Sequence, residues 1–167
     1  MKRTSALVAS AIALVFVVQS AGFAATAVTA KGANGQSMTV SNTKNLPVKG
    51  TWLTISGKRF DETVGIYVSL CVVTKAGNAP TPCGGGIDKT GSTKASAWIS
   101  SNPPRYGIGL ATPYKISGKF SVKIKVGPKI GNFDCRKVKC AIVAKADHTN
   151  PEYRGADVIV PVTFAKK

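Results

Sequence analysis

Four cysteines are the residues of this 167-residue chain that most directly suggest defined chemistry: Cys71, Cys83, Cys135 and Cys140. A zinc site built from paired cysteines needs C-x2-4-C spacing, and the eleven residues between the first two are too many. An even number of cysteines in an exported chain instead predicts disulfides. Three pairings are open, of which Cys71 with Cys83 and Cys135 with Cys140 closes the shortest loops.

The single histidine, His148, precedes an Asn-Pro bend and follows Asp147. One interpretation makes it a haem or metal ligand together with Tyr106 or Tyr153. The other makes it a polar turn residue supported by Asp147. A ligand without a partner at a known spacing is a weak signal, so we expect no metal and no cofactor.

The seven acidic residues form no recognisable general acid–base pair. The chain also contains no nucleophile elbow, metalloprotease, phosphate-binding-loop or dinucleotide-binding motif. With the cysteines assigned to disulfides, no nucleophile is indicated. We therefore expect a non-catalytic protein with no catalytic residues.

Basic residues dominate the charge, with 23 Lys and Arg against 7 acids and a formal charge of +16. They are dense between 115 and 139, and the candidates for a polyanion-binding surface are Lys119, Lys123, Lys125, Arg136, Lys137 and Lys139. Such a field favours DNA or an anionic cell-envelope polymer, bound in a sequence-independent and salt-sensitive way. No aromatic residue alternates with the lysines, so base stacking is not indicated. The alternative is general solubility of a lysine-rich exported protein.

The N-terminus has the three-part pattern of a secretory signal peptide. Lys2 and Arg3 precede an apolar run over 6–18, and small residues lead to a cleavage site after Ala27 or Ala25. The run is too short to span a membrane. We expect a signal peptide over 1–27 and a secreted mature chain of charge +14, with no transmembrane segment, free in the medium or held at the cell surface by charge.

Short apolar and β-branched runs separated by turn residues predict an all-β fold. The expected strands are 38–41, 52–56, 66–73, 120–126, 140–144 and 158–164, with a further short one at 98–100. In 120–126 the alternation is complete: Phe120, Val122, Ile124 and Val126 face inward and the lysines outward. A hydrophobic content of 44% excludes a disordered chain. We expect a flexible leader over 28–36 and one sandwich of about seven strands over 37–165.

The segment 74–117 is irregular and contains Trp98, Tyr106 and Tyr114. A long structureless stretch in a compact domain is often a binding element, although it can also be a surface loop. The three aromatic side chains could line an apolar cleft beside Cys71 and Cys83, or they could cap the core.

Four motifs resemble the neocarzinostatin family, the exported apoproteins of chromoprotein antitumour antibiotics. Ile66-Tyr67-Val68-Ser69-Leu70-Cys71, with Cys83 twelve residues on, is similar to that family's central strand and first disulfide. The segment 134–140 resembles its second disulfide, 114–122 resembles the turn and strand between them, and the segment ending at Phe164 resembles its closing strand. The resemblance covers 38–164.

This resemblance implies a seven-stranded immunoglobulin-like barrel or sandwich with a small disulfide-pinned ribbon. It implies a monomeric carrier, with a DNA-related, defence or antimicrobial role, that holds a small aromatic or apolar ligand beside Cys71–Cys83. The cleft candidates are Val73, Trp98, Tyr106, Tyr114 and Ala141. The chain differs from the family in being basic, in having Val73 where an aromatic is usual and Ala141 where an amide is usual, and in a longer insertion over 84–113.

Overall fold

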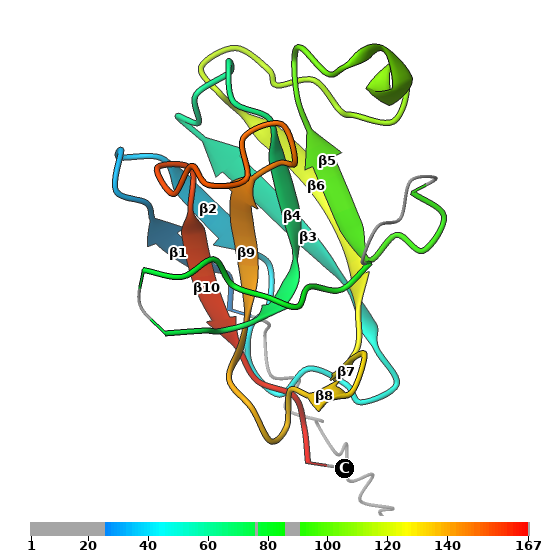
Figure 1. Ribbon diagram of the computed structural model, residues 1–167. Coiled ribbons are helices and arrows are strands. Elements are labelled where there is room, and N and C mark those ends of the chain that lie inside the picture. The colour runs from blue at the N-terminus through cyan, green and yellow to red at the C-terminus, as the bar shows by residue number, and fades with distance from the viewer. Residues whose placement is uncertain (1–25, 76, 86–90, 167) are drawn as a thin grey trace, which may run out of the picture.

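The computed structural model describes residues 26–75, 77–85 and 91–166, and these form two antiparallel four-stranded sheets and a small ribbon (Figure 1). The first sheet has the order β1 (Val28–Lys31), β2 (Ser37–Val40), β3 (Thr51–Lys58), β6 (Phe120–Val126). The second has the order β10 (Val158–Val162), β9 (Cys140–Ala146), β4 (Ile66–Val72), β5 (Ser96–Ile99). The ribbon pairs β7 (Lys129–Ile130) with β8 (Phe133–Asp134), and η1 (Arg105–Gly107) is one 3-10 turn.

The two sheets pack through their inner faces, which the period-2 pattern of the sequence predicts. In β3, Leu53 and Ile55 are buried, while Trp52, Thr54 and Ser56 are exposed. The second sheet contributes Val68, Ile142 and Val160, among other buried residues. The all-β fold expected from the sequence is therefore confirmed, and the strand expected at 120–126 has the predicted bounds.

The segment expected to be a flexible leader is instead part of the first sheet. Val28–Lys31 pairs with Ser37–Val40 as a hairpin, so the described sandwich has eight strands where about seven were expected. Val28 and Ala30 pack against the core. Gln36, 2% exposed, donates from Nε2 to the Gly155 carbonyl at 2.7 Å. The small polar residues of this segment thus form the turn of the hairpin, because long-range burial stabilises the strands beside them.

Both disulfides have the local pairing that the family resemblance implied: Cys71–Cys83 and Cys135–Cys140. The two-stranded ribbon is β7–β8, which lies beside the second disulfide. The first disulfide, expected to pin the ribbon, pins an irregular loop to β4. Cys83 forms an isolated antiparallel bridge with Cys71. On either side of it, Val72 donates its backbone N–H to the Pro82 carbonyl at 2.9 Å, and Gly84 donates to the Leu70 carbonyl at 2.7 Å.

The predicted signal peptide falls almost wholly on residues 1–25, outside the described part of the chain, and stays a prediction. Among the described residues, none belongs to a helix long and apolar enough to cross a membrane.

Candidate functional site

The outer face of the second sheet is partly covered, unlike the outer face of the first. Ser69, Val143 and Ala141 point outward by strand parity, yet they are 3%, 0% and 0% exposed. In Figure 1 the loop that follows β4 runs across β9 and β10 on this side. Val73 and Cys83, at the two ends of this loop, pack against a small cluster of Cys71, Ala141 and Val143. The sequence alone could not predict this crossing, because it depends on where a loop docks.

Between the crossing loop and β10 lies an open depression of about 380 Å³. Its apolar wall includes Val73 and Pro80 from the loop side and Ile159 from β10. Ile159 is 39% exposed, since its side chain is on the outer face of the edge strand. The depression is therefore an open, mostly apolar surface next to the loop that the first disulfide pins, with Thr74 and Asn78 as polar members of its lining.

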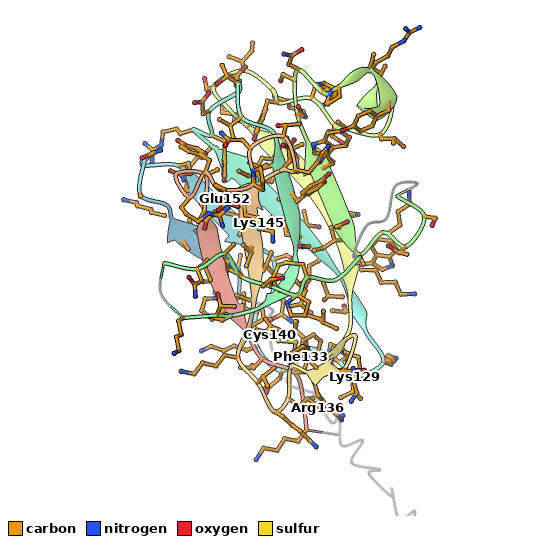
Figure 2. The ribbon with its side chains drawn as sticks, in the orientation of Figure 1. Lys129, Phe133, Arg136, Cys140, Lys145 and Glu152 are labelled. Atoms are coloured by element: carbon orange, nitrogen blue, oxygen red, sulfur yellow. A yellow bond between two sulfur atoms is a disulfide. The ribbon has the colours of Figure 1, made fainter. Side chains whose placement is uncertain are left out.

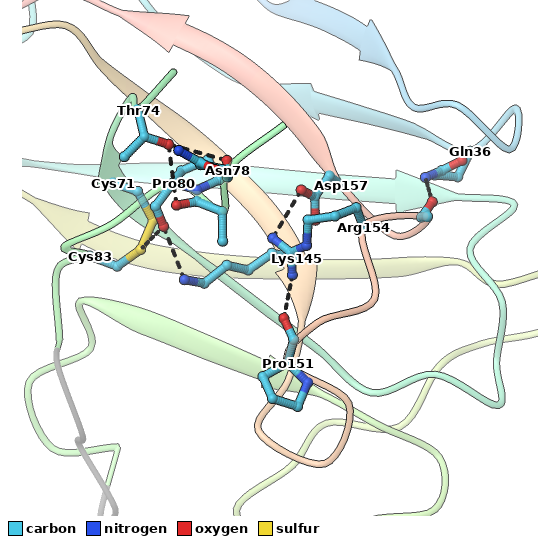
Figure 3. A network of polar contacts seen from close by, with 12 residues as sticks. Gln36, Cys71, Thr74, Asn78, Pro80, Cys83, Lys145, Pro151, Arg154 and Asp157 are labelled. Atoms are coloured by element: carbon cyan, nitrogen blue, oxygen red, sulfur yellow. Dashed lines mark hydrogen bonds and ion pairs between the residues drawn. A yellow bond between two sulfur atoms is a disulfide. The ribbon is translucent and has the colours of Figure 1, made fainter. Parts of the chain in front are cut away.

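Arg154 and Asp157 line one side of this depression, and Lys75 lines its loop side. Lys145 belongs to the polar network around Arg154 and Asp157 (Figure 3). Arg154 donates from Nη1 to Asp157 Oδ2 at 3.1 Å and from Nη2 to the Pro151 carbonyl at 2.6 Å. Lys145 donates from Nζ to the Pro80 carbonyl at 3.0 Å, which ties β9 to the loop. Asp157 Oδ1 is buried and has no hydrogen-bond partner among the described residues.

Partial burial shifts the pKa values of Asp157 and Lys145, and the neighbouring charges modify both shifts. Burial raises the pKa of Asp157, and the nearby Arg154 and Lys145 act in the opposite direction. Burial and the Arg154 charge lower the pKa of Lys145, and Asp157 partly offsets this. No sequence motif pointed to any of these residues. Strand alternation could have predicted that Lys145 and Ile159 face outward, but it could not have predicted that they lie beside the loop.

The five cleft candidates do not form one cleft. Val73 lines the depression, and Ala141 lies buried beneath Val73 and the first disulfide. Tyr114 is a core residue, 8% exposed, whose hydroxyl donates to the Val64 carbonyl at 3.0 Å. Trp98 and Tyr106 stack on each other with ring centroids 6.4 Å apart. Both belong to a separate cluster near the start of β4.

That cluster surrounds the single histidine. Tyr67 Oη lies 2.6 Å from His148 Nδ1, and Tyr106 Oη lies 2.5 Å from Nε2. Trp98 Nε1 donates to Asp147 Oδ2 at 2.8 Å, and Asp147 is 1% exposed. Burial, with the Asp147 charge, raises the pKa of Tyr67 to about 12.

The structure places the His148 ring between the hydroxyls of Tyr67 and Tyr106, next to Asp147. Of the two tyrosines considered as its partners, Tyr106 therefore contacts it. Tyr153, the other partner considered, accepts a hydrogen bond from Asn34 instead. The described residues contain no group of three or more His, Cys, Asp or Glu side chains arranged to hold a metal ion.

The six basic candidates lie on two surfaces. Lys123 and Lys125 are exposed on the outer face of the first sheet, and Lys119 is exposed at the turn that precedes it. Arg136, Lys137 and Lys139 follow the ribbon, at the end of the molecule where Figure 2 shows Arg136 and Lys129.

Arg136 is already paired within the protein. Its Nη2 lies 2.6 Å from Asp134 Oδ2, and Lys129 Nζ lies 3.3 Å from the same oxygen. These contacts, those of Arg136 above all, hold the pKa of Asp134 well below its usual range. Because Arg136 is paired with Asp134, its guanidinium is less available to a polyanion than the ammonium groups of Lys123 and Lys125 are.

Fold and site together define an all-β, two-disulfide sandwich with an apolar depression on one outer face and a basic surface on the other. No protein-family model matches the chain, and no curated protein matches it in sequence. Among solved structures, it is similar to macromomycin at 17% identity, over 78% of this chain and 99% of that one, with a TM-score of 0.47.

Proposed function

We propose that this protein is an exported, non-catalytic binding protein that holds a small, largely apolar ligand in the depression beside Cys71–Cys83. The observation that supports the proposal most is the combination of Val73, Pro80 and Ile159 as an apolar wall with Arg154 and Asp157 at one side. Ligand sites are typically apolar, with a few polar groups that fix orientation.

The polar side of the depression suggests the character of the ligand. Arg154 donates one hydrogen bond to Asp157 and one to the Pro151 carbonyl. Because a guanidinium has five N–H donors, it can donate further hydrogen bonds to a ligand. An apolar body with one anionic or acceptor group would meet both parts of the site. We propose a binding role without catalysis because the most buried carboxylates, Asp134 and Asp147, hold local structure through Arg136, Trp98 and Thr149.

The proposal is tested by filling the depression. Anilinonaphthalene sulfonate, which has an aromatic body and one anionic group, serves as the fluorescent probe. Ile159→Trp places a larger side chain on the wall and should weaken binding by about tenfold or more. Ile116→Trp is the matched control, because Ile116 is 87% exposed in a distant turn, and it should bind as the wild type does.

Both variants should melt close to the wild-type temperature, which excludes probe binding to partly unfolded protein. Equal affinity in the wild type and Ile159→Trp would contradict the proposal.

A second function, binding of polyanions, is favoured by a different observation. The outer face of the first sheet presents Lys58, Lys123 and Lys125, all exposed, and β2, β3 and β6 contain no acidic residue. A polyanion such as DNA or an anionic envelope polymer would be held there by charge, with an affinity that falls as salt rises. Reversing the charges of Lys123 and Lys125 should weaken that binding.

A further inference from the structure

An exposed tryptophan lies beside the lysines of the first sheet. Trp52 is 54% exposed and pairs directly with Lys125 across β3 and β6. Directly opposite side chains in an antiparallel pair have Cβ atoms about 4.5–5.5 Å apart and share one face of the sheet. The expectation that no aromatic interleaves with these lysines on their outward face was therefore wrong: β6 itself carries none there, but Trp52 of the neighbouring β3 shares that face.

The residues around Trp52 are hydroxylic or basic. Thr54 pairs with Lys123, and Ser56 pairs with Ser121. All of them are exposed. We call this surface the Trp52 face, defined as Trp52, Thr54, Ser56, Ser121, Lys123 and Lys125. A single exposed apolar side chain needs no explanation by itself. An indole set among cations and hydroxyls, with no acid on these strands, is a more specific combination.

We propose that the Trp52 face binds extended single-stranded nucleic acid, with one base stacked on the indole. This inference rests on the polyanion binding proposed above and names its ligand. Lys123 and Lys125 are alternate residues of one strand, so their side chains emerge about 7 Å apart. That separation suits successive phosphates of an extended single strand. The hydroxyls of Thr54 and Ser121 can donate to phosphate oxygens.

The arrangement favours a single strand over a duplex. Stacking on an aromatic side chain needs an unpaired base with a free face, and aromatic platforms combined with a basic surface are the usual means of binding single strands. A duplex would use the lysines and leave Trp52 without a role. Recognition by stacking and charge is tolerant of sequence, so no base preference is expected.

The test uses the disulfide-bonded protein and a fluorescently labelled oligothymidylate of about eight nucleotides, within the range of known single-strand site sizes. Trp52→Ala should weaken binding on the order of tenfold, and Trp52→Phe should recover most of the loss because stacking needs a ring rather than an indole. Lys123→Glu with Lys125→Glu should abolish most binding. A control pair, Lys44→Glu with Lys75→Glu, makes the same charge change at exposed lysines elsewhere.

The salt dependence gives a second measure. Truncating both lysines to alanine should reduce the slope of log affinity against log salt by about 1.4, at 0.7 for each phosphate contact. If Trp52→Ala binds as the wild type does while the lysine variants fail, the stacking proposal is overturned and polyanion binding stands. If the control pair weakens binding as much as the strand pair does, both proposals fail. The stacking proposal would also be overturned if the protein bound a duplex or polygalacturonate as tightly as the oligothymidylate and if Trp52→Ala left that affinity unchanged.

Discussion

At the scale of single residues, Asp134 shows how one carboxylate organises a turn. It is 6% exposed and accepts hydrogen bonds from the Arg136 backbone N–H at 3.0 Å and from Arg136 Nε at 2.9 Å. Lys129, on the facing strand of the ribbon, approaches the same carboxylate at 3.3 Å. The contacts join the ribbon to the turn that contains Cys135.

Asp134→Asn should therefore lower the melting temperature at neutral pH, by on the order of a few degrees. The folded pKa of Asp134 is depressed, so its stabilisation is present above the unfolded value of about 3.9 and is lost as pH falls toward the folded value. The difference between the two proteins should shrink below about pH 4. Thermal unfolding monitored between about pH 2 and pH 7 measures it.

Glu152→Gln is the control for that experiment, because Glu152 is an exposed acid far from the ribbon (Figure 2). A melting difference for Asp134→Asn that stayed constant at all pH values would show that charge is not what Asp134 contributes.

At the scale of elements, the turn that leads into β6 is held by backbone contacts and by Glu62, whose Oε1 accepts a hydrogen bond from the Gly118 backbone N–H at 2.8 Å. Lys115 and Lys119 exchange backbone hydrogen bonds across it, at 2.7 and 3.0 Å. Phe60 donates its backbone N–H to the Gly118 carbonyl at 3.3 Å. Gly118 has φ +59, and a Cβ there would lie 1.9 Å from the Phe60 carbonyl oxygen. Only glycine permits this close approach.

Gly118→Ala should destabilise the protein by about 3 kcal/mol or more, because it adds a left-handed backbone penalty to a backbone clash. Gly127→Ala, just after β6, is the matched control. A Cβ at Gly127 would have nothing within 4 Å, and this variant should be close to the wild type. Denaturant unfolding of both proteins checks the prediction, and equal midpoints for the two would refute it.

At the scale of the whole molecule, the two proposed sites lie on the outer faces of different sheets, with the hydrophobic core between them (Figure 1). The apolar depression belongs to the loop–β10 side, and the Trp52 face belongs to β3 and β6. Neither site shares a residue with the other.

The two ligands should therefore bind independently. A saturating oligothymidylate should change the dissociation constant for anilinonaphthalene sulfonate by less than about twofold, because the sites have no common side chains and coupling needs a bistable element that neither site supplies. The measurement is a probe titration with and without the oligonucleotide. Displacement of the probe would place both ligands on one surface and would contradict the separation of the sites.

The sequence by itself determined the local features of this protein. The alternation in β3 and β6 assigned Leu53 and Ile124 to the core and Lys123 to the surface, because period 2 within one strand is enough to distinguish its faces. The cysteine motifs led to the correct disulfides through a family resemblance. The sequence also predicted that His148 lies in a turn, and the structure places it in one, directly after the buried Asp147.

Only the tertiary structure decided what lies beside what. The pairing of Val28–Lys31 into the first sheet, the loop that brings Pro80 to Lys145, and the placement of Trp52 beside Lys125 all join segments far apart in the chain. Strand alternation says which side of a sheet a residue faces, but strand neighbours and loop positions depend on long-range packing. The residues of both proposed sites are therefore visible in the sequence, and their assembly into sites is not.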